Sequence, residues 1–212
     1  MRPPRPLIFV LPCALLLAAC AGPGLRPVTD PEVRVQTARF SVLPPSGPHW
    51  KVEGPGATMV LFAKFDPAHY RTPQDKSHTL LAFTLAYTLP NSADMASPAA
   101  LRRTVEFYLS TPALNDSGRY KVQDVAYEPF RLHDTDCLRY EAHLTETNNP
   151  RLPGLVLDMT SFGVFCRHPT QQHLLVESTC SERLPAGHPT LIDAAFRAEC
   201  WHMIDSLEFP GR

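Results

Sequence analysis

Short apolar runs with alternating polarity recur through the chain, and proline, glycine or aspartate bounds them. Alternation with a period of two predicts strands that bury one face, and the bounding residues predict turns. The expected strands are 40–43, 50–52, 58–65, 79–89, 120–130, 137–147, 155–165 and 173–180. We therefore expect the body of the chain to be mainly an antiparallel sheet.

Two segments repeat apolar residues at helical spacing instead. Segment 94–109 carries Leu101, Val105 and Tyr108 on one stripe, behind a capping residue and a proline in the expected first turn. Segment 191–207 predicts an amphipathic helix that packs on the sheet. The order of elements predicts an α+β fold in which two helices cover the apolar face of a mainly antiparallel sheet.

The N-terminus has the features of an export signal. Arg2 and Arg5 precede an apolar run at 7–19, and small residues lead up to Cys20. The run is about 13 residues long, whereas a membrane-spanning helix needs roughly 20 apolar residues. We expect a signal peptide at 1–19 and no permanent anchor helix.

Leu17-Ala18-Ala19-Cys20 resembles the cleavage motif of bacterial lipoprotein signals. The resemblance implies that cleavage leaves Cys20 as the first residue and that this cysteine carries acyl chains such as palmitate. Ala21 follows, and a residue other than aspartate there favours the outer membrane by analogy with enterobacterial sorting. We expect a periplasm-facing lipoprotein of the bacterial cell envelope, held to the membrane by its acyl chains. An ordinary signal peptide cut near Ala19 is the alternative.

Composition predicts how the rest is divided. Residues 20–37 are rich in proline and glycine, so we expect a lipidated tether there and a single α/β sandwich domain at 38–212. The formal charge is −1 and no basic stripe is present, which argues against a nucleic-acid partner. The partners expected are the membrane, through the lipid anchor, and an unknown envelope protein.

Four cysteines remain in the body: Cys137, Cys166, Cys180 and Cys200. An even number in an exported chain predicts disulfides, and four cysteines allow three pairings. A hairpin centred near Arg151 would place Leu138 opposite Phe165, Leu144 opposite Met159 and Cys137 opposite Cys166. That register favours the pair Cys137–Cys166 and leaves Cys180–Cys200. The spacing of the four residues does not fit a zinc site.

Short motifs at 40–42 and 48–52, with the strand end at 177–183 and the closing segment 196–209, resemble the Mog1/PsbP-like α/β sandwich family. The resemblance spans roughly residues 38–209 and implies that fold. The family includes many envelope lipoproteins and has no shared catalytic constellation, so the resemblance implies no chemistry.

Candidate chemical groups are few. His133-Asp134-Thr135-Asp136 could supply metal ligands, and His168 and His173 flank one turn, but turns are ordinary places for such residues. The chain has no nucleophile elbow and no phosphate-binding glycine loop. Cys166-Arg167-His168 would need a free thiolate, which disulfide formation removes. We therefore expect no catalytic residues, no metal and no cofactor.

Five aromatic residues gather in the first half of the chain: Phe62, Phe65, Tyr70, Phe83 and Tyr87. At alternating strand positions they are typical of a core. They would line a binding groove if one face of the sheet were left uncovered.

The hypothesis that follows is a non-enzymatic binding or scaffold module on the envelope. One alternative is a periplasmic hydrolase or metal-dependent enzyme that uses 133–136 or the turn between His168 and His173. The other is a carrier of a small apolar ligand, which predicts an apolar cavity between sheet and helix.

Overall fold

The computed structural model describes residues 24–65, 77–90, 93–110, 119–150 and 152–210. The expected signal peptide, Cys20, Ala21 and Tyr70 lie outside these ranges.

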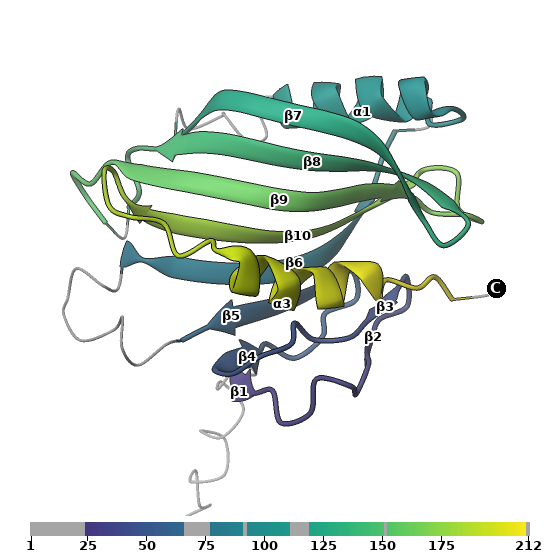
Figure 1. Ribbon diagram of the computed structural model, residues 1–212. Helices are drawn as coiled ribbons and strands as arrows, with labels where there is room; N and C mark the ends of the chain where they lie inside the picture. Colours follow the sequence, from purple (N-terminus) through teal and green to yellow (C-terminus); the bar gives the residue numbers. More distant parts are fainter. Residues whose placement is uncertain (1–23, 66–76, 91–92, 111–118, 151, 211–212) are drawn as a thin grey trace, which may run out of the picture.

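In the described part of the chain, eight strands form one antiparallel sheet (Figure 1). From one edge to the other, the order is β1 (Arg26–Pro27), β4 (Trp50–Val52), β5 (Met59–Lys64), β6 (Thr79–Thr88), β10 (Leu174–Pro185), β9 (Leu157–Arg167), β8 (Thr135–Glu146) and β7 (Tyr120–Leu132). A separate pair joins β2 (Val35–Gln36) to β3 (Ser41–Val42). The mainly antiparallel sheet predicted from alternation is confirmed, and β10 runs past its expected end at residue 180.

The two described helices lie on opposite faces of this sheet. Helix α3 (Ala194–Asp205) packs Phe196 and Met203 into the larger core cluster, whereas α1 (Pro98–Ser110) packs Leu101 and Val105 into a second cluster. The expectation that both helices cover one apolar face is therefore wrong. The physical reason is that the central strands are apolar on both faces, so each face needs a partner. Within the described residues, no helix is long and apolar enough to cross a membrane.

The α1 face is covered unevenly. In β6, Leu80, Ala82, Thr84 and Ala86 are buried on the side of α3. The alternate residues of that strand keep partial exposure: Leu81, Phe83, Leu85 and Tyr87. Helix α1 packs over β8 and not over these residues of β6.

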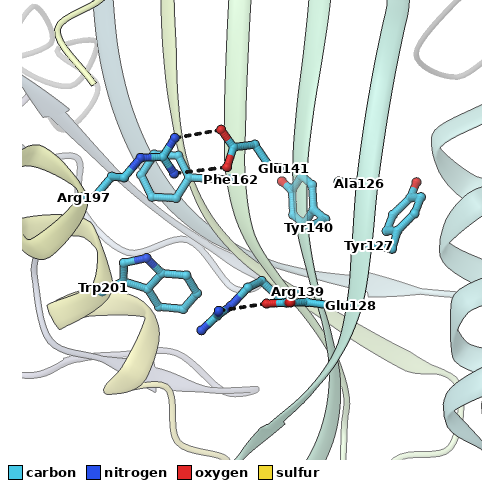
Figure 2. A pocket seen from close by; sticks show the side chains of 9 residues that line it. All are labelled: Ala126, Tyr127, Glu128, Arg139, Tyr140, Glu141, Phe162, Arg197 and Trp201. Carbon is cyan, nitrogen blue, oxygen red and sulfur yellow. Dashed lines mark hydrogen bonds and ion pairs between the residues drawn. The ribbon is translucent and has the colours of Figure 1, made fainter. Parts of the chain in front are cut away.

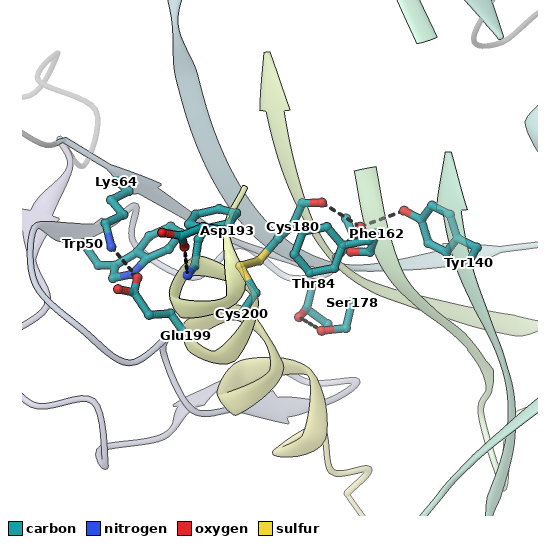
Figure 3. The surroundings of a disulfide bond; sticks show 12 residues. Trp50, Lys64, Thr84, Tyr140, Phe162, Ser178, Cys180, Asp193, Glu199 and Cys200 are labelled. Atoms are coloured by element: carbon teal, nitrogen blue, oxygen red, sulfur yellow. Dashed lines mark hydrogen bonds and ion pairs between the residues drawn. A yellow bond between two sulfur atoms is a disulfide. The ribbon is translucent and has the colours of Figure 1, made fainter. Parts of the chain in front are cut away.

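Both predicted cysteine pairs are joined. Cys137 of β8 is bonded to Cys166 of β9, at directly opposite positions of the ladder. Cys180 of β10 is bonded to Cys200 of α3, which fixes the helix to the middle of the sheet (Figure 3). The hairpin register also pairs Leu138 with Phe165 and Leu144 with Met159, as predicted.

The folded body begins earlier than the sequence suggested. Strand β1 pairs with β4, the backbone N–H of Val28 donates to the Trp50 carbonyl at 2.9 Å, and Val35 packs against the larger core cluster. Arg34 donates to the Ser206 carbonyl at 2.8 Å. The boundary placed at residue 38 is therefore too late, because Pro27 lies in an edge strand, where a missing N–H is tolerated.

Candidate functional site

A hollow with an apolar lining lies on the α1 face of the sheet, over strands β6, β10, β9, β8 and β7. Its volume is about 220 Å³. Phe83 and Tyr87 of β6 reach it because side chains alternate between the two faces of a strand, and these two point away from α3. Further apolar side chains come from β7, β8 and β9: Val122, Val125, Leu144 and Met159. Few polar side chains join them, which is typical of a small-molecule pocket.

A buried carboxylate lies in the lining of this pocket. Glu177 of β10 is only 6% exposed, and each of its oxygens accepts one hydrogen bond from a tyrosine. The Tyr87 hydroxyl donates to Oε2 at 2.5 Å, and the Tyr140 hydroxyl donates to Oε1 at 2.6 Å. Thr179 Oγ1 lies 2.7 Å from the Tyr140 oxygen. The carboxylate is therefore held in one orientation by rigid neighbours.

Burial controls the protonation of this cluster. Loss of water around Glu177 raises the pKa of its carboxyl, and the hydrogen bonds from Tyr140 and Tyr87 oppose that rise in part. Burial, followed by the nearby Glu177 charge, raises the pKa of Tyr140 well above its ordinary value. Tyr140 thus stays protonated at any physiological pH and remains a hydrogen-bond donor.

The same face carries a second buried acid with a different environment. Glu146 at the end of β8 forms ion pairs with Arg119 and, at 3.3 Å, with Arg183, and it also accepts from Asn149 at 3.0 Å. Glu177 forms no ion pair with any lysine, arginine or histidine that the structure describes. Two acids on one face therefore differ in whether the described residues supply a countercharge.

A second hollow, of about 350 Å³, lies between α3 and strands β7 and β8 (Figure 2). Its charges are already paired: Arg197 makes two bonds to Glu141, at 2.7 and 3.2 Å, and Arg139 donates to Glu128 at 2.8 Å. The Arg139 guanidinium also lies 4.6 Å from the Trp201 ring centre. The acids and arginines of this groove therefore already have opposite charges beside them, although the buried Nε of Arg139 has no hydrogen-bond partner among the described residues.

His133 and Asp134 form the tight turn between β7 and β8, and Thr135 and Asp136 begin β8. His133 has φ 51°, and Asp136 lies 3.3 Å from the Arg167 guanidinium. His133 lines a different hollow from the one that contains His168 and His173. Among the residues with described positions, no group of three or more His, Cys, Asp or Glu could hold a metal ion.

His168 and His173 line one hollow together with Asp94 and Arg167. The Nδ1 atom of His168 accepts from the backbone N–H groups of Thr170 and Gln171, at 3.3 and 3.2 Å. Burial lowers the pKa of this imidazole, and its ring packs edge-on against Phe209 with centres 5.0 Å apart. The side chain thus has a structural part in closing its turn.

Two aromatic residues of the apolar pocket were predicted from the sequence, but its buried acid was not. Phe83 and Tyr87 belonged to the aromatic set expected to line a groove if one sheet face stayed uncovered, whereas Phe62 is fully buried. Glu177 and Tyr140 were not singled out as site residues. The usable signal was a lone glutamate inside the strand 174–180, whose other residues are apolar or small.

No family model matches the chain, and no curated protein matches it in sequence. Among solved structures, the chain is similar to the solution structure of cyanobacterial PsbP (CyanoP) from Synechocystis sp. PCC 6803. The TM-score is 0.42 and the identity 12%, over 91% of this chain and 98% of that chain. A likeness at this level carries no argument about this chain.

Proposed function

We propose that this chain is an envelope lipoprotein whose folded body binds a small apolar molecule without catalysing a reaction. The observation that carries the proposal is the pocket beside Glu177, with a volume of about 220 Å³ and a mainly apolar lining. An engineered cavity of roughly 150 Å³ in another protein holds benzene. A ligand of one or two rings fits this space.

The pocket favours the carrier function over that of a pure scaffold, because it offers a mainly apolar surface for a small molecule. Its described lining comes from strands alone, so it differs from the cavity between sheet and helix expected for a carrier. A hydrolase would need its acid, base and nucleophile within reach of one another. Segment 133–136 and the pair His168 and His173 line separate hollows. The geometry thus supports binding better than catalysis.

Export and anchoring complete the proposal. The lipoprotein-like signal ends just before Cys20, and two disulfides in the body suit an oxidising compartment such as the periplasm. Acyl chains on Cys20 would contribute ~0.8 kcal/mol per buried CH2 group, so two or more chains would give stable attachment. The first packed strand at Arg26 follows closely, which would keep the body near the lipid surface.

Ligand binding can be tested with toluene and indole as neutral probes, detected by saturation-transfer NMR on the secreted Cys20→Ser protein. We expect both probes to bind, and Ser161→Phe to abolish binding because the added ring fills the pocket. Ala126→Phe, which places the same ring in the groove of ion pairs, is the matched control and keeps binding. Absence of binding to the parent protein, or full binding by a folded Ser161→Phe variant, would overturn the proposal.

Anchoring is tested by fractionating cells that produce the full chain. Cys20→Ser should release the protein from the membrane fraction, whereas Cys13→Ser, inside the segment expected to be removed, should leave it there. Retention of the Cys20→Ser protein in the membrane would contradict the lipid anchor.

A further inference from the structure

We propose that the ligand of this pocket is an organic cation, with an ammonium group that pairs with Glu177 and an apolar body that fills the remaining space. This inference rests on the proposed binding function and names the class of ligand.

Glu177 has no countercharge among the residues that the structure describes. A buried carboxylate costs free energy unless a cation or several donors compensate it. Glu146, on the same face, has two arginines, but neither Arg119 nor Arg183 pairs with Glu177. A cation entering from the pocket would restore the compensation that the described residues do not supply.

The Glu177 carboxylate keeps unused capacity to accept hydrogen bonds. Each carboxylate oxygen can accept two hydrogen bonds, and the tyrosines use one on each oxygen. The bonds from Tyr87 and Tyr140 fix the plane of the group without neutralising it. An ammonium donor can therefore bind the free lone pairs without displacing either tyrosine.

The lining of the pocket is rich in aromatic rings. Four rings border the hollow: Phe83, Tyr87, Tyr120 and Tyr140. The face of an aromatic ring attracts cations, and it does so more strongly where water is excluded. Apolar side chains such as Leu144 and Met159 provide a surface for hydrocarbon. The pocket therefore matches an amine that carries one aromatic or branched aliphatic group.

The test compares three ligands of similar size and different charge: 2-phenylethylamine, 2-phenylethanol and phenylacetate. Dissociation constants are measured by calorimetry on the secreted Cys20→Ser protein at neutral pH. We expect the amine to bind at least about tenfold more tightly than the alcohol, as a charge-assisted hydrogen bond implies, and phenylacetate to bind most weakly.

Variants then assign the preference to one residue. Glu177→Gln keeps the shape of the side chain and should bring the amine and the alcohol to similar affinities. Glu128→Gln, the same change in the groove of ion pairs, should leave the preference intact. If Glu177→Gln does not fold, the carboxyl carbon of Glu177 in the parent protein gives a second measurement. We expect its NMR signal to shift with the amine and not with the alcohol.

The outcomes separate this inference from the proposed function. Equal binding of the amine and the alcohol, with no change in the Glu177 carboxyl signal, would overturn the proposal of a cationic ligand. The proposal that the chain carries an apolar ligand would remain. Failure of toluene, indole and all three charged and neutral ligands to bind would overturn both.

Discussion

At the scale of single residues, Gly163 in the middle of β9 shows how tightly the sheet is packed. A Cβ atom at this position would overlap the Ser178 carbonyl oxygen and lie 2.7 Å from the Thr179 Cα. Because both are backbone atoms of β10, neither can move aside without opening the ladder. Gly163 therefore allows β10 to approach closely and to hold Glu177 and Thr179 in place.

We expect Gly163→Ala to lower the free energy of unfolding by about 1–3 kcal/mol, as overpacking of a core does. The measurement is urea unfolding followed by circular dichroism. Gly24→Ala is the control, since nothing lies within 4 Å of the added atom there. Equal midpoints for the two variants would contradict the close packing inferred at Gly163.

The raised pKa of Glu177 predicts how the stability of the folded protein changes with pH. Its pKa in the folded protein is above the ordinary value of 4.5, so the unfolded chain ionises first as the pH rises. The folded state is therefore progressively disfavoured between about pH 4.5 and the raised pKa, and the cost is absent at lower pH. Glu177→Gln removes this titration.

We expect the stability of Glu177→Gln relative to the parent protein to increase as the pH rises from about 4 to about 8. Urea midpoints of both proteins across this range provide the measurement, and the difference between them cancels the other carboxyl groups. A constant difference would show that Glu177 titrates as in the unfolded chain.

At the scale of elements, the two disulfides have different consequences. Cys137–Cys166 joins strands that the ladder of β8 and β9 already holds together. Cys180–Cys200 joins the central strand to α3, and the helix otherwise depends on packing and on side-chain bonds such as Trp50 to Glu199 at 2.9 Å (Figure 3). The second bridge therefore fixes an element that no backbone ladder holds.

We expect Cys180→Ala/Cys200→Ala and Cys137→Ala/Cys166→Ala each to cost about 2–4 kcal/mol of unfolding free energy. Hydrogen exchange distinguishes them. Loss of Cys180–Cys200 should accelerate exchange in α3 selectively, while loss of the other bridge should leave α3 protected. Equal exchange in α3 for both double variants would contradict the role assigned to Cys180–Cys200.

The sequence could predict features that depend on neighbours along the chain. The hairpin between β8 and β9 is local, so one assumed turn was enough to pair Cys137 with Cys166. The placement of α1 was not predictable in this way, because β9 offers apolar residues to both faces at Val164 and Phe165. Periodicity identifies a buried strand but does not say which helix covers which face.

The pocket illustrates the same limit. Tyr87, Tyr140 and Glu177 come from three strands, β6, β8 and β10, and meet only once β10 is placed in the middle of the sheet. Alternation predicted that Phe83 and Tyr87 would share a face. Glu177 lies between these two residues and Tyr140 because of the strand order, and local sequence patterns do not predict that order.

At the scale of the whole molecule, the N-terminal segment and the pocket lie toward opposite edges of the sheet. Strands β1 and β4 form one edge (Figure 1). The residues that line the pocket belong to strands from β6 to the other edge at β7. Segment 26–36 contributes β1, β2 and the bonds of Arg34 to Ser206 and Glu208. Stability and ligand binding should therefore respond differently to the removal of this segment.

We expect a secreted body that begins at residue 38 to lose about 3 kcal/mol or more of unfolding free energy relative to one that begins at residue 24. The loss reflects the backbone bonds of β1 and the burial of Val28 and Val35. Toluene should still bind to the folded fraction of both proteins with similar affinity, because the lining residues are intact. Equal urea midpoints would mean that segment 26–36 is a tether after all. Loss of toluene binding by a folded short form would mean that the pocket depends on the distant edge of the sheet.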